Sequence, residues 1–142
     1  MNENLLPIRK KLIRLALDLA SEDYHIELDF SEKSLRKVDE ILLTLRKQLK
    51  STPDSEEKRL GTQGIALELC AYIVQVIENH YGEGKWERDS KEYGKETWPF
   101  THSGVTIFPM NWCLKCIDNG RKDKVWRKYN TFVDAMKKQV DA

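Results

Sequence analysis

The stretch IALELCAYIVQVI, residues 65–77, constrains the fold of this chain more than any other part of the sequence. Apolar side chains occupy nearly every position, whereas a helix on a protein surface carries them along one face only. A helix of this composition is stable in water only when other elements surround it. The run is also shorter than the roughly 20 residues that a membrane span requires. We therefore expect a central helix over residues 65–79, no membrane span, and the rest of the chain packed around this helix.

The polar residues of the predicted central helix fall on one line. Their spacing of four, three and four residues places them on one helical face, and they are Glu68, Tyr72, Gln75 and Asn79. One interpretation is a solvent-exposed edge. The alternative is the floor of a groove, in which Glu68, Tyr72 and Gln75 bind a small molecule or a substrate. This alternative predicts a concave pocket over the stripe and a raised pKa for Glu68.

Four further helices are predicted from apolar residues at three- and four-residue steps. Pro7 and Pro109 favour helix starts, because the first helical turn tolerates a missing amide hydrogen. Ser31 or Ser34 can cap the second helix. The segment STPDSEEK at residues 51–58 predicts a mobile surface loop, and HIELDF before the second helix predicts an extended approach to it. The expected helices span residues 6–20, about 34–50, 109–120 and about 123–140.

A change of composition after residue 81 predicts a small antiparallel sheet. The segment is rich in Gly, Trp, Tyr and Thr and has no helical period, which is typical of short strands. We expect two or three strands, near residues 85–89, 97–101 and 104–108, with HSG as the tight turn between the last two. The predicted fold class is therefore α+β: about five helices around the central helix and a sheet over about residues 85–108. A chain of 142 residues is the usual size of one domain, here residues 1–142.

The Cys-x-x-Cys of WCLKC suggests a redox or zinc site, and a core turn is the competing interpretation. Cys113 and Cys116 fall in a predicted helix among apolar residues, and cysteine is often buried. A zinc site needs about four ligands, but no second ligand pair accompanies these cysteines: His80 and His102 are isolated, and Cys70 lies in the apolar helix. The sequence thus favours a core turn and indicates neither a metal nor another cofactor.

No set of residues with the spacing of a known catalytic motif is present. The three histidines lie in three different contexts, and Gly-x-Ser-x-Gly and phosphate-binding loop patterns are missing. The sequence GTQG at residues 61–64 is better interpreted as the entry to the central helix than as an anion site. We therefore favour a binding protein over an enzyme, with no catalytic residues assigned.

The charge of the chain is balanced overall but graded along its length. The formal net charge is +1, and residues 1–60, 61–114 and 115–142 carry 0, −3 and +4. Such a layout suits a protein partner better than nucleic acid, whose footprint would be a stronger basic patch. Three cysteines without regular spacing and an N-terminus without signal-peptide features favour the cytoplasm. The oligomeric state stays open, and a homodimer is one option.

Aromatic residues of the predicted sheet region are the remaining candidates for binding. Trp86 and Trp112 are expected to fill the space between sheet and helices, whereas Trp98, before Pro99, is expected to be exposed; exposed tryptophans often anchor partners. Together with the polar stripe, the candidate binding residues are Glu68, Tyr72, Gln75, Trp98 and His102.

The order of several segments resembles a group of small bacterial domains without assigned enzyme activity. The shared pattern is a Leu-Asp-aromatic-Ser helix start, an apolar helix bearing Tyr and Glu, a Gly-x-Trp strand and a Pro-opened helix ending in Asn-Gly. Its places are taken here by Leu28 to Ser31, Tyr72, Glu78, Gly84 with Trp86, Pro109, and Asn119 with Gly120. The resemblance implies a fold shared with bacterial proteins of no assigned enzyme activity, some of which look like immunity-type or other small binding proteins. Together with the charge gradient and the aromatic-rich sheet, it leads us to expect a cytoplasmic immunity-type or adaptor-type protein that binds another protein.

Overall fold

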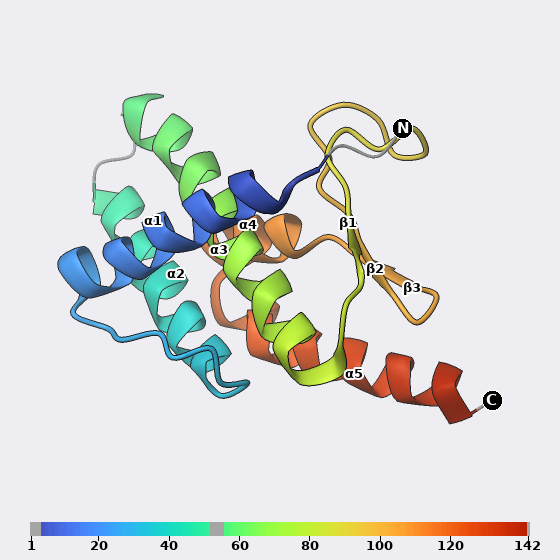
Figure 1. The fold of residues 1–142 in the computed structure, drawn as a ribbon. Coiled ribbons are helices and arrows are strands. Elements are labelled where there is room, and N and C mark those ends of the chain that lie inside the picture. Colours follow the sequence, from blue (N-terminus) through green and yellow to red (C-terminus); the bar gives the residue numbers. More distant parts are fainter. Residues whose placement is uncertain (1–3, 52–55, 142) are drawn as a thin grey trace.

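The computed structural model describes residues 4–51 and 56–141, and within them the predicted α+β fold is confirmed (Figure 1). Five α-helices and a three-stranded antiparallel sheet are present in these residues. In chain order the elements are α1 (Leu6–Tyr24), α2 (Ser34–Ser51), α3 (Glu56–Tyr81), β1 (Lys85–Trp86), β2 (Phe100–His102), β3 (Val105–Ile107), α4 (Pro109–Asn119), a 3-10 turn (Gly120–Asp123) and α5 (Val125–Asp141).

Helix α3 is the central element, as its composition predicts. It packs against α1 on one side and α4 on another, and in Figure 1 it passes between these two helices. Its middle section is buried all round, because the side chains of Leu69 to Val74, together with Val76 and Ile77, are inaccessible to solvent. This burial removes apolar surface that a surface helix of the same sequence would leave in water.

Helix α3 begins nine residues before the predicted start, at Glu56. The prediction that residues 61–64 form the helix entry is therefore wrong, since both glycines of GTQG lie inside the helix. Glycine disfavours a helix interior by about 1 kcal/mol relative to alanine, but the side chains of Thr62 and Ala66 in this section are buried. Burial there compensates for the weak local preference. Of the predicted loop 51–58, residues 52–55 lie outside the described residues, and residues 56–58 are helical.

The approach to α2, residues 25–30, contains no helix or strand, and a capping serine starts the helix. The backbone N–H of Ser34 donates to Ser31 Oγ at 3.1 Å, which makes Ser31 the cap that the sequence suggested. Just before it, Phe30 adopts a left-handed φ of 64°, and its N–H donates to the Tyr72 hydroxyl at 2.9 Å. A tyrosine of α3 therefore holds the start of α2 in place.

The sheet has the order β1-β2-β3, and all pairs are antiparallel. Its inner face carries the buried side chains of Trp86, Phe100 and Ile107, which pack against the helices. Residues of the outer face pair across the three strands as Lys85, Thr101 and Thr106. The sheet is thus a cap with one buried and one polar face.

The first two strands belong to a long hairpin that extends beyond the sheet. Backbone bonds from Glu87 N to Pro99 O (3.0 Å) and from Asp89 N to Thr97 O (2.8 Å) continue the pairing of β1 with β2. In Figure 1 this hairpin projects away from the helices. The pairing therefore reaches the predicted limits, near residues 85–89 and 97–101, although regular strand geometry is shorter.

Among the residues that the structure describes, no helix is both long enough and apolar enough to cross a membrane.

Candidate functional site

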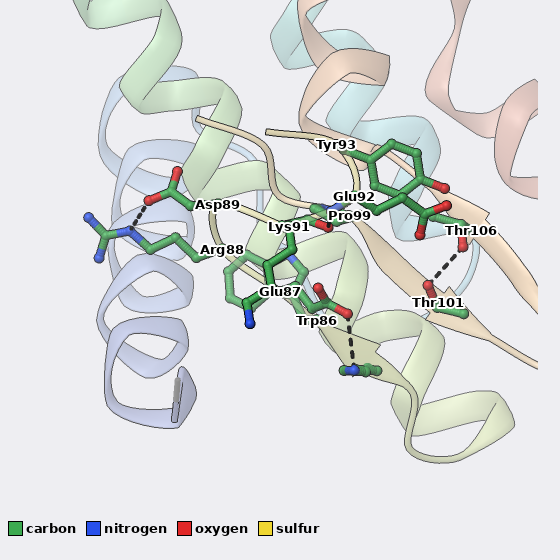
Figure 2. Close-up of a pocket in the computed structure, with 12 residues that line it drawn as sticks. Trp86, Glu87, Arg88, Asp89, Lys91, Glu92, Tyr93, Pro99, Thr101 and Thr106 are labelled. Atoms are coloured by element: carbon green, nitrogen blue, oxygen red, sulfur yellow. Dashed lines mark hydrogen bonds and ion pairs between the residues drawn. The ribbon is translucent and has the colours of Figure 1, made fainter. Parts of the chain in front are cut away.

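The outer face of the sheet, together with the projecting hairpin, forms a polar hollow of about 410 Å³. Figure 2 shows Thr101 and Thr106 on the strands at one side of the hollow, and the Arg88–Asp89 pair at the other. The hydroxyl oxygens of the two threonines are 2.8 Å apart and form a hydrogen bond. Tyr93, at the tip of the hairpin, lines the hollow as well.

Charges of both signs surround this hollow. Lys85 Nζ lies 3.2 Å from Glu87 Oε1, and Arg88 Nε lies 3.9 Å from Asp89 Oδ2. These pairs are well exposed, so each contributes little to stability. Their side chains can therefore exchange their present partners for those of a bound molecule at small cost.

Side-chain hydrogen bonds hold the tip of the hairpin, residues 90–96, in a defined conformation. Asp89 Oδ1 accepts a bond from Glu96 N at 2.5 Å, and the Thr97 hydroxyl donates to Gly94 O at 2.7 Å. The N–H of Ser90 donates to the same hydroxyl at 3.2 Å. Short polar side chains replace regular strand pairing here, which presents the exposed side chains of the tip in a pre-organised arrangement.

Three residues of the hairpin combine into an aromatic and cationic surface. Tyr93 is 44% exposed and also borders a second hollow of about 250 Å³, which Trp98 and Phe108 line. The Arg88 guanidinium lies 5.5 Å from the centre of the Trp98 ring. We name Arg88, Tyr93 and Trp98, with the two hollows on either side of Tyr93, the hairpin surface. Trp, Tyr and Arg are the residue types that dominate binding energy in protein interfaces.

Trp98 is half-buried, not fully exposed as the sequence suggested, because it stacks on a neighbouring tryptophan. Its ring centre lies 5.2 Å from that of Trp86, with 37° between the planes. Trp86 is buried, as predicted, while Trp112 is partly buried and packs edge-on against Phe132 at 6.5 Å. The contact with the buried Trp86 restricts the Trp98 side chain, and a side chain that is already restricted loses little conformational entropy when it binds a partner.

The structure separates the members of the predicted polar stripe. Tyr72 is fully buried, and its hydroxyl lies 2.6 Å from Ser34 Oγ besides accepting the bond from Phe30 N. Gln75 donates to Asn79 Oδ1 at 2.8 Å on the surface. Tyr72 therefore has a structural role at the start of α2, and the stripe is not a continuous solvated edge.

Glu68 is the member of the polar stripe that still fits the ligand-binding alternative. It is partly buried, and burial raises the pKa of its carboxyl group, as the ligand-binding alternative predicts. A hollow of about 500 Å³ lies between α1, α2 and the first half of α3, and its lining includes Leu45, Gly61 and Ile65. Glu68 follows Ile65 by three residues on the same face of α3, but none of Glu68, Tyr72 and Gln75 lines this hollow.

His102 fastens the sheet to the end of α3. Its Nε2 atom lies 3.0 Å from Tyr81 O and 3.1 Å from Gly82 O, and its Nδ1 atom lies 2.8 Å from Ser103 Oγ. A ring whose two nitrogens both have protein partners is positioned as a structural link. Its contacts thus place it at the end of α3, apart from Trp98 and the hairpin surface.

All three cysteines lie in the core, which confirms WCLKC as a core turn. Burial raises the pKa of the Cys70 thiol and that of the Cys116 thiol to about 12, and it raises the pKa of Cys113 well above its usual value. Protonated thiols are poor nucleophiles and poor metal ligands. Within residues 4–51 and 56–141, no three or more His, Cys, Asp or Glu side chains are grouped so as to hold a metal ion.

A buried carboxylate that the sequence analysis missed joins α2 to α5. Asp39 Oδ1 accepts the backbone N–H of Val125 at 2.6 Å, and Oδ2 accepts that of Trp126 at 3.0 Å. Burial raises the pKa of Asp39, while these two bonds oppose the shift. A signal was available, because Asp39 lies four residues after Leu35 and three before Leu42, on the apolar face of its helix. Asp39 acts as the cap of α5 from another helix.

Glu32 is a second carboxylate with a role that only the structure reveals. Its Oε2 atom accepts hydrogen bonds from the hydroxyls of Tyr81 (2.9 Å) and Tyr129. Burial raises the pKa of Glu32, but the bonds from Tyr129 and Tyr81 outweigh burial, so the net pKa is lowered. The carboxylate thus connects the start of α2 with the end of α3 and with α5.

A third polar contact attaches α1 to the sheet. Arg9 of α1 forms an ion pair with Glu78 of α3, and Glu78 Oε2 also accepts the N–H of Gly84 at 2.9 Å. The Arg9 guanidinium lies 5.5 Å from the centre of the Trp86 ring. Glu78, Gly84 and Trp86, which carry part of the resemblance to the bacterial domains, therefore meet at one structural junction.

No known protein family, curated protein or solved structure matches this chain. The resemblance to small bacterial domains stays an expectation.

Proposed function

We propose that this protein is a non-catalytic binding domain whose hairpin surface contacts another protein. The observation that carries the proposal is the projecting hairpin, which presents Arg88, Tyr93 and Trp98 between two hollows. The ordered tip supports the proposal, because a pre-organised surface loses less conformational entropy on association.

The buried titratable groups support a binding role over a catalytic one. Asp39 and Glu32 have their carboxylate oxygens engaged in bonds between elements, and burial raises the pKa of the cysteines. These groups stabilise the fold and are not poised for proton transfer or nucleophilic attack. By extension of the sequence resemblance, we propose an immunity-type or adaptor-type protein of the bacterial cytoplasm.

The proposal is tested by photo-crosslinking in cells of the source organism. A photoreactive phenylalanine analogue at Tyr93 should give a crosslinked product with one partner, identified by mass spectrometry. The same analogue at Leu15, an exposed position on α1, is the matched control and should not give this product. Excess wild-type protein should compete the product away, whereas an Arg88→Ala, Tyr93→Ala double variant should not. A product that both proteins compete equally, or no product specific to Tyr93, would contradict the proposal.

A second candidate function is the binding of a small molecule near Glu68. It is favoured by the partly buried Glu68 carboxyl group, whose pKa burial raises. The hollow between α1, α2 and α3 reaches Ile65 but is not lined by Glu68. A Glu68→Gln variant should then change the melting temperature shift that a ligand from a metabolite panel produces on wild-type protein. If no panel compound shifts the wild-type melting temperature, this candidate loses its support.

A further inference from the structure

Strand β3 leaves one backbone edge of the sheet open among the residues that the structure describes. The turn between β2 and β3 is a two-residue turn, and His102 and Val105, which flank it, form a hydrogen-bonded pair. Backbone pairs then alternate, so Thr106 lies in the next, non-bonded pair. The bond from Glu87 N to Pro99 O shows the same alternation on the other side of β2. The N–H and C=O of Thr106 therefore point away from the sheet.

A groove of about 360 Å³ lies beside this open edge, between β3 and α5. Val105 and Ile107 line it from the strand, and Phe132 lines it from the helix. Figure 1 shows α5 passing next to the hairpin of β2 and β3, and the two elements are in contact. The short side chains of Thr131 and Ala135 on α5 also line the groove and keep it open. Alternate side chains of a strand added to β3 would enter this groove.

Two cationic side chains give the groove a preferred ligand charge. Arg127 and Lys128 both line it. The Nζ atom of Lys128 is buried and pairs with Asp123 Oδ1 at 3.3 Å, so only the stem of this side chain is offered to the groove. Arg127 is exposed, and its guanidinium carries five donors for an acidic ligand. Residues 115–142 also carry eight basic and four acidic side chains, a net charge of +4.

We propose that the groove between β3 and α5 binds an extended acidic segment of a partner protein, which adds to β3 as a fourth strand. The segment residue opposite Thr106 exchanges two backbone hydrogen bonds with it. The neighbouring residues of the segment place an apolar side chain against Ile107 and Phe132, and a carboxylate near Arg127. Strand addition beside a helix is a known mode of peptide recognition.

The charge of the groove favours an acidic segment over a second copy of this chain. Pairing of β3 with β3 of a second copy would follow a twofold axis. Among the described residues, the lining of the groove includes two basic side chains and no acidic one, so a second copy of the same surface matches its charge less well than an acidic segment does. The groove lies on the opposite face of the sheet from Thr101 and Thr106, which line the hairpin surface, so this proposal and the proposed function can fail separately.

The probe for the first experiment is a library of random peptides displayed on phage. It is selected on the wild-type protein and depleted on a Thr131→Trp variant, whose large side chain fills the groove from an exposed position. We expect enriched sequences with an acidic residue two positions from an aliphatic or aromatic one, because alternate residues face the same side of a strand. No enrichment over the depleted background would overturn the proposal.

An enriched peptide, synthesised with a fluorophore, then tests the geometry on matched variants. Thr106→Pro removes the outward N–H and the hydroxyl bond to Thr101, but no backbone bond between β2 and β3. It should weaken binding about tenfold or more, as expected for a lost backbone bond. Thr106→Val keeps the N–H, loses only the hydroxyl, and should bind within about twofold of wild type. Arg127→Met should weaken binding about tenfold, whereas Lys138→Met, exposed on the same helix, should not.

Two further measurements keep the test decisive. If Thr106→Pro does not fold by circular dichroism, peptides methylated on each backbone nitrogen in turn replace it, and one position should abolish binding. Equal losses for Thr106→Val and Thr106→Pro, or for Arg127→Met and Lys138→Met, would refute strand addition with an acidic segment. Dimerisation of the wild-type protein in sedimentation runs, lost in Thr131→Trp, would instead assign the groove to a second copy and overturn the proposal.

Discussion

Replacing Asp39 by alanine should destabilise the fold by about 3 kcal/mol, because this side chain caps α5 from inside the core. Asp39 is 3% exposed, and its carboxylate accepts the first two backbone N–H groups of α5 at 2.6 and 3.0 Å. A lost cap costs about 1 to 2 kcal/mol, and bonds to a charged group contribute about 1.5 to 3 kcal/mol. These two estimates describe overlapping interactions, so they are not added. For a chain of 142 residues, the loss corresponds to a melting temperature lower by roughly 10 °C.

The assay is urea unfolding followed by tryptophan fluorescence and circular dichroism. Asp39→Asn keeps one acceptor oxygen and should lose about half as much stability. Glu40→Ala, its exposed neighbour on α2, is the control and should change stability by less than about 0.5 kcal/mol. If Asp39→Ala were as stable as Glu40→Ala, the cap argument would be refuted, since two buried donors would then have lost their acceptor without cost.

Three further predictions follow from burial and close packing. The native cysteines should stay unreactive toward a thiol reagent at mildly alkaline pH and react fully after denaturation, because burial raises the pKa of two of them to about 12. A fast reaction of the native protein, or stoichiometric zinc by elemental analysis, would support the metal or redox alternative. Gly84→Ala should lower the free energy of unfolding by about 2 kcal/mol, because the added Cβ would lie 2.8 Å from Thr101 O. Gly64→Ala, in open space on α3, should raise the free energy of unfolding by about 1 kcal/mol. Thermal unfolding measures both variants, and equal effects would refute this reasoning. The bonds from Tyr129 and Tyr81 outweigh burial and lower the pKa of Glu32 from 4.5. The contribution of Glu32 to stability is therefore present above pH 4.5 and is lost as the pH falls below that value. Glu32→Gln should show a flatter acid unfolding profile than wild type, and identical profiles would contradict this prediction.

The sequence predicted the helices and the sheet of this fold because the spacing of apolar residues and the preferences of turn residues act between neighbours along the chain. The apolar run at residues 65–77 predicted a buried helix, and α3 is central. The proline at residue 109 and the composition of residues 85–108 predicted the start of α4 and the antiparallel sheet. The start of α3 was missed, because two glycines at residues 61–64 predict a helix entry locally, while packing continues the helix back to Glu56.

The candidate sites show the limit of local pattern more clearly. Tyr72 and Gln75 share a helical face with Glu68, so the sequence treats them alike. In the structure Tyr72 is buried under Phe30 and Ser34, while Gln75 stays at the surface. The difference arises because the chain before α2 covers one part of this face and not the other. Periodicity identifies a face of a helix, but it does not show which element covers it.

The sequence by itself determined that this chain forms one buried helix surrounded by amphipathic ones, with a small sheet and cysteines in a core turn. These properties follow from the burial of apolar side chains, because the spacing of these side chains can be seen directly in the sequence. Only the tertiary structure decided where Arg88, Tyr93 and Trp98 meet, that Asp39 caps a helix 86 residues away, and that β3 and α5 enclose a cationic groove. Such contacts depend on the relative placement of elements, and that placement results from packing over the whole chain.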